Sequence, residues 1–372
     1  MNIIWIIVIS AAGLYSILVL SYLAGWHRLS GFDRQKMRES HPVSLIIPVR
    51  NEERNIRPLL TDIDNQLYPA DKIDVIFIND HSEDNTRQEI LSGQSNRNIR
   101  IIDLPGHENG KKSAIRKGLE ESKTDIILML DADSEIYDRW ISDMTGCLIQ
   151  TGSRLVFGPV RYRGRNPWER IQQLELYSLV GTGAAACGLN SPILCNGTNM
   201  ICYRKDYLQF YDSNGQNTVS GDDVFFLLWL KKQFPGRITF LKSPDSVIET
   251  EPSSGFLPFI QQRLRWISKT RFYKDPHIIL SSMTVFLVNF LLLALLIGMT
   301  ANLQLWKTFV LLFTSKIVTD FVFLFSVTKY YKSQSLLIYF LPIQLVYFIY
   351  VIFIAVAGNM LPVSWKGRKH KI

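Results

Sequence analysis

The sequence predicts an α/β protein with a mostly parallel sheet, preceded by one membrane-spanning helix and followed by two or three more. Short apolar runs alternate with helical stretches between residues 43 and 131, which is the pattern of a parallel sheet. Long segments without any charged residue are the second observation, and each reaches the ~20 residues that a helix needs to cross a bilayer. These segments cover residues 3–24, 278–306 and 333–365.

The charge distribution favours a membrane surface over nucleic acid as the partner. The formal net charge is +8, yet no run of Lys and Arg of the nucleic-acid-binding type occurs. The excess lies largely beside the apolar segments, which is typical of cytoplasmic anchoring against anionic lipid. These flanking residues are Arg28, Arg34, Lys36, Arg38, Lys366, Arg368, Lys369 and Lys371. The four cysteines form no C-x-x-C pair, which indicates reduced thiols in a cytosolic domain.

The first apolar segment predicts an uncleaved anchor over residues 1–26. No Lys or Arg precedes it, so the basic region of a signal peptide is missing, and basic residues follow it instead. The positive-inside bias then places the amino terminus outside and the following domain, residues 42–250, in the cytoplasm. We therefore expect an integral protein of the plasma (inner) membrane.

Within residues 42–250 the apolar pattern predicts alternating strands and helices. Asn51 is expected to cap the first helix, residues 181–188 to be small and flexible, and residues 195–199 to form a turn-like loop. The expected strands are 43–49, 74–78, 99–104, 126–130, 153–158 and 237–241, and the expected helices after the first are 112–122, 167–180 and 222–232.

The C-terminal third is expected to be membrane-bound. Residues 251–276 read as an amphipathic helix in the membrane interface, although a helix packed under the sheet also fits. Spans are expected at 278–303, 308–328 and 334–357, within a region 278–358 that precedes a basic tail, 359–372. Lys316 and Asp320 lie four residues apart inside the second span, so we expect an ion pair. Three crossings place the basic tail outside, against the positive-inside bias, so either one segment does not cross or the tail breaks the rule.

Asp131 and Asp133 directly follow the apolar run 126–130. Side chains alternate along a strand, so two carboxylates two residues apart point the same way. They would open into the crevice where α/β sheets bind ligands, and their hard oxygens suit Mg²⁺ or Mn²⁺ shared with a substrate phosphate. An acidic strand end that starts the next helix fits the same spacing.

Two further polar groups follow predicted strands. Asp80 ends the second strand, where a carboxylate accepts hydrogen bonds from a nucleobase or ribose, or where its neighbours cap a helix. Lys111, at a predicted helix start, is placed to meet a phosphate. The surrounding glycines resemble a P-loop only weakly, and no G-x-G-x-x-G occurs, which argues against a dinucleotide dehydrogenase.

Two motifs have both a functional and a structural interpretation. Asp222 and Asp223 open a predicted helix, where a carboxylate acts either as a general base or, with Ser220, as a capping box. Gln262, Arg265 and Trp266 offer an amide, a guanidinium and an indole, suited to a diphosphate and a sugar or lipid, but also typical of a basic, aromatic membrane helix.

Taken together, these motifs resemble the inverting glycosyltransferase family 2, over residues 43 to 266. The resemblance rests on a Pro-Val-Arg-Asn-Glu-Glu strand exit, Asn-Asp-x-Ser-x-Asp, Gly-Lys, Asp-x-Asp, Asp-Asp before a helix and Gln-x-x-Arg-Trp. It implies a GT-A fold, which is Rossmann-like, and the flanking segments look like those of cellulose synthase, hyaluronan synthase and ceramide glucosyltransferase.

The resemblance also implies roles for individual residues. Asp80 would contact the nucleotide base, Asp131 the ribose or sugar and the metal, and Asp133 the divalent metal. Asp223 would be the general base. The remaining implied residues are Lys111, Gln262, Arg265 and Trp266 on the donor side, and Asn196, Gly197, Thr198 and Asp222 on the acceptor side. Asp222 stands where the family more often has Glu.

The function implied is transfer of a sugar from a nucleotide sugar to a hydroxyl of a lipid or lipid-linked glycan. A UDP-sugar is expected in preference to a GDP-sugar. The transfer would proceed with inversion and with Mg²⁺ or Mn²⁺. Two alternatives stay open. One is a processive polysaccharide synthase, although four spans at most are few for a polymer channel. The other is a membrane protein that binds nucleotide sugars without catalysis.

Overall fold

The computed structural model describes residues 3–34, 39–93, 95–213, 221–360, 363–365 and 368–370. The chain divides into two compact units, which are treated separately below. We call Arg28–Arg163 with Ala186–Glu251 the sheet unit, and Met1–His27 with Gly164–Ala185 and Pro252–Ile372 the membrane unit.

The sheet unit is built on a seven-stranded sheet with the order β3-β2-β1-β4-β7-β5-β8. Neighbouring strands are parallel except that β7 runs antiparallel to both β4 and β5. A separate parallel pair joins β6 and β9. The strands are β1 Val43–Val49, β2 Ile73–Asn79, β3 Asn98–Asp103, β4 Ile126–Met129, β5 Leu155–Phe157, β6 Val160–Tyr162, β7 Met200–Tyr203, β8 Ile238–Phe240 and β9 Ile248–Thr250.

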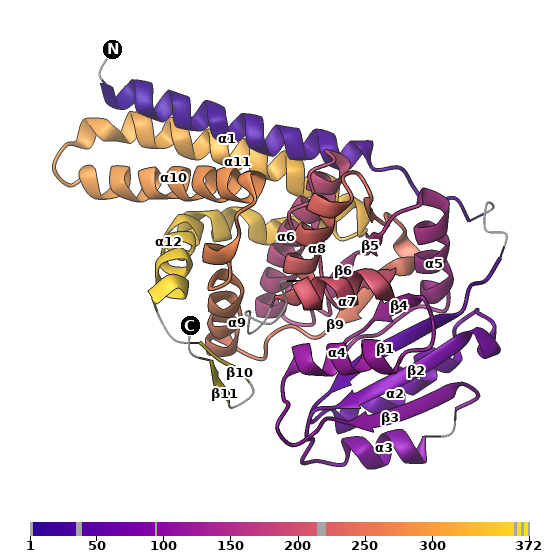
Figure 1. Cartoon of the computed structure of the whole chain (residues 1–372). Coiled ribbons are helices and arrows are strands. Elements are labelled where there is room, and N and C mark those ends of the chain that lie inside the picture. Colours follow the sequence, from indigo (N-terminus) through magenta and orange to yellow (C-terminus); the bar gives the residue numbers. More distant parts are fainter. Residues whose placement is uncertain are drawn as a thin grey trace. The chain divides into compact units, whose positions relative to one another are not determined.

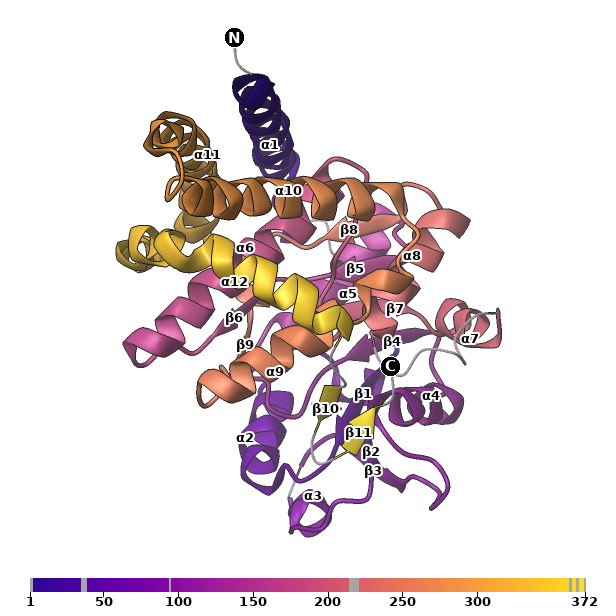
Figure 2. The ribbon, with the colours of Figure 1, turned by 90° about the vertical axis from the view of Figure 1, so that its left-hand side faces the viewer.

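The central strands are apolar because helices cover the sheet on both faces. Every residue of β4 is buried, and so are all but one each in β1 and β2. Figure 2 shows α2 and α4 on opposite sides of β1 and β2. The helices of this unit are α2 Glu53–Asp64, α3 Thr86–Ser92, α4 Lys111–Glu121, α5 Trp140–Thr151, α7 Arg204–Ser213 and α8 Asp222–Gln233. The predicted mostly parallel α/β sheet is therefore confirmed.

Several local predictions need correction. Asn51 does not cap α2: its φ is 54°, and its side-chain oxygen accepts a hydrogen bond from the Glu83 amide at 2.8 Å. Residues 181–188 are not a flexible segment, because helix α6 continues through them from Pro167 to Gly188. Their small side chains serve close packing instead, since a Cβ at Gly181 would lie 2.7 Å from Val327. The sequence pattern did not predict β6, β7, β9, α3, α5 and α7. The capping partner Ser220 and the basic residues Lys36, Arg38, Lys366 and Lys371 lie outside the described residues.

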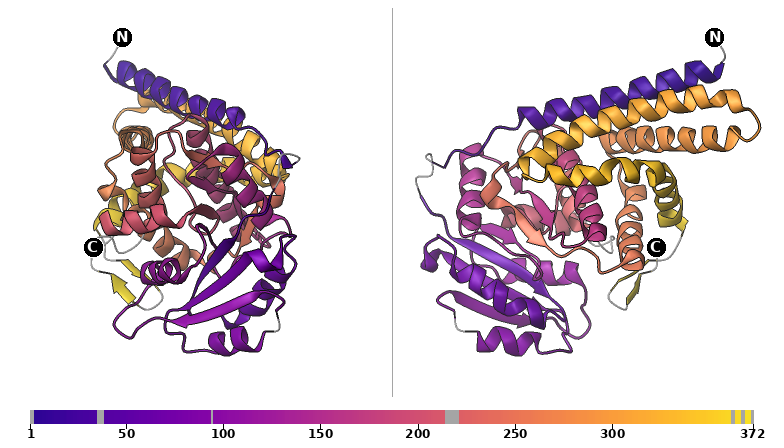
Figure 3. Two further views of the ribbon diagram at one scale, coloured as in Figure 1. Left: turned by 45° about the vertical axis from the view of Figure 1, so that its right-hand side comes forward. Right: turned by 180° about the vertical axis from the view of Figure 1, so that it is seen from behind.

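The membrane unit holds four helices that are long and apolar enough to cross a membrane, within the described ranges. Three of them are C-terminal, which is the upper of the two predicted numbers. Figures 1 and 3 show α1 running alongside α11. The long helices are α1 Ile3–Arg28, α10 Pro276–Gly298, α11 Trp306–Tyr330 and α12 Phe340–Met360, and the shorter α9 covers Phe256–Ile267. At the backbone level, β10 Val363–Trp365 and β11 Arg368–His370 form an antiparallel pair.

The predicted ion pair inside the second C-terminal helix is present. The Lys316 ammonium lies 2.7 Å from Asp320 and donates to the Gln344 side chain of α12 at 2.7 Å. The Tyr15 hydroxyl of α1 donates to the other Asp320 oxygen at 2.6 Å. One buried polar cluster therefore connects three of the four long helices.

Candidate active site

Sheet topology brings the candidate acids of the sheet unit to one edge. Strands β1, β2 and β4 are parallel, so the residues that follow them emerge at the same edge. Strand β7 is antiparallel to β4 and pairs Met200 with Met129, so it begins where β4 ends. The loop before β7 therefore meets the residues after β4, although about 65 residues separate them in the sequence.

Asp131 is held from two sides. Its backbone N–H donates to the Thr198 hydroxyl at 3.1 Å, and its carboxylate accepts a hydrogen bond from the Lys111 ammonium. Thr198 also pairs with the Ser134 hydroxyl at 2.8 Å. These contacts connect the Asp-x-Asp segment to the first residue of α4 and to the loop before β7.

The Lys111 ammonium interacts electrostatically with three acidic side chains. Burial lowers the pKa of its ammonium, but attraction to Asp131, Asp223 and Asp133 outweighs this effect, so the pKa is raised. The structure thus brings Lys111 and these three predicted site residues into one electrostatic neighbourhood.

Asp133 lies next to like charge. Desolvation by surrounding protein raises the pKa of its carboxyl to about 6, and Asp131 and Glu52 act in the same direction, whereas Lys111 opposes them. The side chain nevertheless reaches solvent, so the desolvation is partial. The Thr250 hydroxyl of β9 donates to Asp133 at 3.3 Å. Two neighbouring carboxylates repel each other when both are charged, which raises a pKa, and a bound cation would relieve this repulsion.

The loop before β7 also holds Asp223. The Gly197 N–H donates to one Asp223 oxygen at 3.2 Å, and the Val224 N–H donates to the other at 2.9 Å. A Cβ at Gly197 would lie 3.2 Å from the Asp223 Cβ, so this close approach favours glycine. Asp223 is therefore fixed in orientation at the start of α8.

Buried Asn199 anchors this loop. Its side-chain nitrogen donates to the carbonyls of Pro159 and Ser246 at 2.8 and 2.9 Å, and its oxygen accepts from the Trp140 indole at 2.9 Å. Asn196, one turn earlier, accepts the Asn199 N–H at 3.1 Å through its carbonyl. The loop is consequently rigid at its base although it has no regular secondary structure.

Asp80 and Asp222 occupy separate buried positions. Asp80 accepts a hydrogen bond from the Gly110 N–H at 3.0 Å and lies 4.0 Å from the Arg50 guanidinium. Gly110 has a φ of 91°, a conformation that glycine adopts without strain. Asp222 accepts from the buried Tyr211 hydroxyl at 3.1 Å. The nucleotide-base role of Asp80 and the acceptor role of Asp222 stay predictions.

Gln262, Arg265 and Trp266 belong to α9 of the membrane unit. They lie along the last two turns of this helix, and Arg265 falls in its final turn. Their predicted role toward the diphosphate stays a prediction.

Several residues around the candidate acids were not anticipated from the sequence. Thr250 donates to Asp133, Glu52 acts on Asp133 through its charge, Ser134 bonds to Thr198, and Asn199 anchors the loop before β7. Ser134 was detectable, because it lies beside Asp133. Thr250 gave no signal, because it reaches Asp133 through the pairing of β9 with β6 and with Glu135, which are far from it in the sequence.

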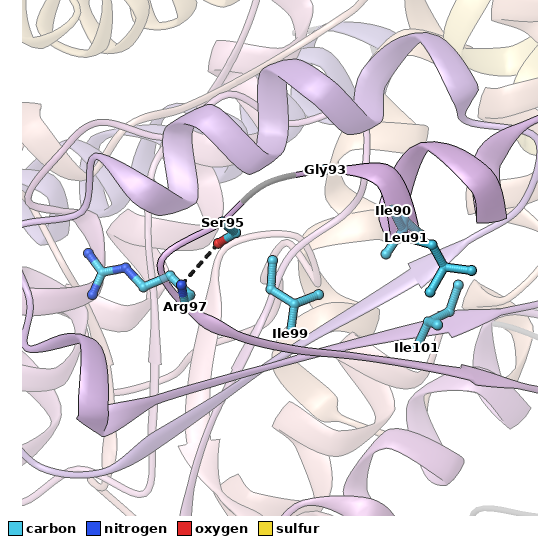
Figure 4. Close-up of a pocket in the computed structure, with 7 residues that line it drawn as sticks. All are labelled: Ile90, Leu91, Gly93, Ser95, Arg97, Ile99 and Ile101. Atoms are coloured by element: carbon cyan, nitrogen blue, oxygen red, sulfur yellow. Dashed lines mark hydrogen bonds between the residues drawn. The ribbon is translucent and has the colours of Figure 1, made fainter.

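A separate hollow of about 260 Å³ lies between α3 and β3 (Figure 4). It is lined by Ile90 and Leu91 of the helix, Ile99 and Ile101 of the strand, and the intervening turn. No acidic side chain lines it, so it does not offer the chemistry of the Asp131 neighbourhood.

Comparison with known proteins identifies the sheet unit. The family model "Glycosyl transferase family 2" matches residues 44–211. Glycosyltransferase AglE of Haloferax volcanii is 25% identical over 226 residues, which cover 60% of this chain and 71% of that protein. Dolichol-phosphate mannosyltransferase of Saccharomyces cerevisiae is 36% identical over 93 residues, which cover 24% of this chain but only 34% of that protein.

A solved structure has the same fold. Mannosyltransferase PcManGT from Pyrobaculum calidifontis, in complex with GDP-Man and Mn²⁺, aligns over 87% of this chain and 97% of its own, with a TM-score of 0.60 at 17% identity. The mostly parallel sheet is thus GT-A-like, as the sequence resemblance implied. The matched domain and the similar glycosyltransferases agree, so residues 44–211 form a glycosyltransferase family 2 domain and the chain is a glycosyltransferase.

Proposed function

We propose that the protein is an inverting, metal-dependent transferase that moves a sugar from a UDP- or GDP-sugar to a hydroxyl of a lipid or lipid-linked acceptor at the membrane. The observation that carries this proposal is the meeting of three acids at one edge of the sheet: Lys111 binds Asp131, and the loop with Gly197 and Thr198 contacts both Asp131 and Asp223. Transfer from a nucleotide sugar requires two carboxylates that can bind a divalent metal, a third carboxylate that acts as a base, and a positive side chain that attracts the phosphates.

The donor atoms present fit a divalent metal. No group of three or more His, Cys, Asp or Glu arranged for a metal occurs among the described residues. Asp131 and Asp133 nevertheless offer hard oxygens, and Asp131 and Glu52 place further negative charge near Asp133. Mg²⁺ and Mn²⁺ are commonly held by one or two carboxylates together with substrate phosphates. Bound there, the cation would neutralise charge developing on the departing nucleoside diphosphate. The Mn²⁺ in the PcManGT complex supports this choice.

Asp223 is our candidate for the general base. Two backbone N–H groups fix its carboxylate, so it is orientated before the acceptor arrives. It takes the proton from the acceptor hydroxyl while that oxygen attacks the anomeric carbon from the face opposite the diphosphate. The anomeric configuration inverts in this single displacement. Lys111 is placed to attract the diphosphate.

The acceptor and the location follow from the membrane unit. Four helices suited to cross a membrane support an acceptor that resides in the bilayer. The relative named dolichol-phosphate mannosyltransferase supports a lipid phosphate in this role. Basic residues at and beyond the end of α1, such as Arg28 and Arg34, favour a cytoplasmic sheet unit at the inner membrane.

The proposal is tested with purified full-length protein in lipid nanodiscs. UDP- and GDP-sugars are incubated with membrane lipid extract and Mn²⁺ or Mg²⁺, and products are identified by mass spectrometry. Asp223→Asn should lower turnover by at least about 100-fold, because general-base catalysis is worth about 10²–10⁴. Asp133→Asn should lower turnover strongly as well, because it removes a candidate metal ligand. Asp71→Asn, a change in an exposed acid of the sheet unit, is the matched control and should leave turnover unchanged.

Each alternative outcome identifies a different error. Near-normal turnover of either site variant would show that the residue roles are wrong. A long polymer product would favour the processive alternative. If the protein binds a nucleotide sugar but neither transfers the sugar nor slowly hydrolyses the donor, the alternative of a protein that only binds nucleotide sugars is favoured.

A further inference from the structure

A buried network in the membrane unit surrounds the helix that carries Gln262 and Trp266. Helix α9 packs against α6 and α12 through an apolar cluster of Phe259, Ile260 and Ile354. The approach to α12 is close, because a Cβ at Gly358 would lie 2.8 Å from Ile267. The position of α9 is therefore set by two other helices.

Arg263 lies at the centre of this packing. It is only 3% exposed, an unusual position for a charged side chain, and it requires a partner there. Its Nε and Nη2 atoms donate to one Glu175 oxygen of α6 at 3.0 and 2.6 Å. The other Glu175 oxygen accepts from the Tyr350 hydroxyl of α12 at 2.7 Å. One carboxylate thus connects α6, α9 and α12.

The same guanidinium also contacts two residues of the Gln-x-x-Arg-Trp motif. Its Nη1 atom donates to the Gln262 side-chain oxygen, which also accepts from the Ser253 hydroxyl at 3.3 Å. Its flat face lies 4.2 Å from the centre of the Trp266 ring, and Phe259 lies 4.5 Å away. Ser253 is itself paired with Gln172 of α6 in both directions, at 3.0 Å each.

We propose that Arg263, held by Glu175 and Tyr350, is a positioning residue that orients Gln262 and Trp266 for sugar transfer; this rests on the proposed function and on the donor-side role that the family resemblance implies for those two residues. Two donors fix the Gln262 oxygen, and this sets the direction of its amide nitrogen, the group that can donate to a phosphate oxygen. Stacking on Arg263 likewise sets the plane of the Trp266 indole.

The network calls for arginine and not simply for positive charge. One planar group makes two bonds to Glu175, one bond to Gln262 and a stacking contact with Trp266, which a lysine ammonium cannot reproduce together. The bonds to Glu175 and Gln262 and the contacts with Phe259 and Trp266 already engage this guanidinium. Arg263 therefore acts through its neighbours, and we assign it no contact with substrate.

The experiment compares two tyrosines in equivalent settings. Tyr350 donates to Glu175, the partner of Arg263, and Tyr15 donates to Asp320, the partner of Lys316. Sugar transfer by the full chain in nanodiscs is measured for Tyr350→Phe and Glu175→Gln, with Tyr15→Phe as the matched control. We expect kcat to fall several-fold in Tyr350→Phe and at least tenfold in Glu175→Gln, with donor KM changed less than threefold, because Asp80 and Asp131 would still hold the nucleotide. Tyr15→Phe should keep the wild-type kcat.

A double variant separates positioning from stability. Glu175→Gln combined with Arg263→Met removes both buried charges, so the thermal midpoint should recover toward that of the wild type. The kcat should stay at least tenfold low, because Gln262 and Trp266 remain without Arg263. The single variant Arg263→Lys should retain only part of the wild-type kcat.

The outcomes distinguish this inference from the proposed function. If the wild type transfers no sugar from any nucleotide sugar, the proposed function is wrong and the inference falls with it. If the wild type is active and Glu175→Gln retains its kcat, only the inference is wrong. Recovery of kcat together with stability in the double variant would also overturn it, because the network would then be purely structural.

Discussion

Single residues in the sheet unit are fixed by neighbours that the sequence does not place beside them. Asp131 is held by Lys111 and Thr198, and Asp223 is held by the amides of Gly197 and Val224. A carboxylate held in this way is orientated before a reaction begins, which lowers the cost of reaching the reactive geometry. Small displacements at these positions should therefore reduce turnover more than binding.

Gly197→Ala tests this expectation. The new methyl group would lie 3.2 Å from the Asp223 Cβ and 3.3 Å from one of its oxygens, so Asp223 must shift by a few tenths of an ångström. A misplacement of about 1 Å costs about 100-fold in rate, so we expect kcat to fall about threefold to tenfold. Steady-state kinetics of sugar transfer measure this. Gly106→Ala is the control, because its Cβ would meet no atom within 4 Å. An equal loss in both variants would contradict the explanation.

At the scale of elements, the pairing of β6 with β9 supports the Asp-x-Asp segment. Thr250 of β9 donates to Asp133, and Glu135 pairs with Glu249 through backbone hydrogen bonds of 2.8 and 3.1 Å. Arg161 and Arg163 both bind the Glu249 carboxylate. The ion pairs of Glu249 with Arg161 and Arg163 thus help to position Thr250, which donates to the candidate metal ligand Asp133.

The stability contributed by Glu249 should depend on pH. Desolvation raises the pKa of Glu249, but hydrogen bonds and charge from Arg163 and Arg161 outweigh it, so the pKa lies below its ordinary value. A lowered pKa in the folded state stabilises the fold above the unfolded-state pKa, and this contribution is lost as pH falls through the folded-state pKa. Glu249→Gln should therefore lower the thermal midpoint at pH 7, and the difference from the wild type should shrink as pH falls below about 4.5. Thermal melts between pH 7 and 4 test this, and a difference that grows in acid would refute it.

At the scale of the whole molecule, the membrane unit combines apolar helices with a few buried polar groups. Lys316 is 2% exposed, and its partners come from α11 and α12, while α1 reaches Asp320 through Tyr15. Polar groups inside a membrane are costly unless they are paired within the protein. We therefore expect this cluster to fix which helices associate, without taking part in transfer.

Lys316→Met should destabilise the folded protein by about 3 kcal/mol, because it leaves the Asp320 charge buried without its cation. The double variant Lys316→Met with Asp320→Asn should recover most of this loss, since both charges are then removed. Denaturant unfolding in detergent gives the free energy of unfolding of each variant. Lys307→Met, at an exposed position of α11, should change it by less than about 0.5 kcal/mol. A double variant as unstable as the single one would contradict the ion-pair explanation.

The sequence by itself determined the features that depend on local pattern. Continuous apolar runs predicted β1, β2 and β4, because strands covered on both faces need apolar residues throughout. Uncharged segments of sufficient length predicted α1, α10 and α12, and a weaker apolar segment that contains two charges predicted α11. A four-residue spacing predicted the Lys316–Asp320 pair. Motif order was enough to indicate the family.

Only the tertiary structure decided which distant residues meet. The antiparallel direction of β7 brings Gly197 and Thr198 to the end of β4, and no local pattern encodes strand direction. Thr250 meets Asp133 through pairing of β9, and Glu175 meets Arg263 through packing of α6 on α9, although 117 and 88 residues separate the members of these pairs. Such contacts depend on how whole elements pack, whereas periodicity reports only what each element does along its own length.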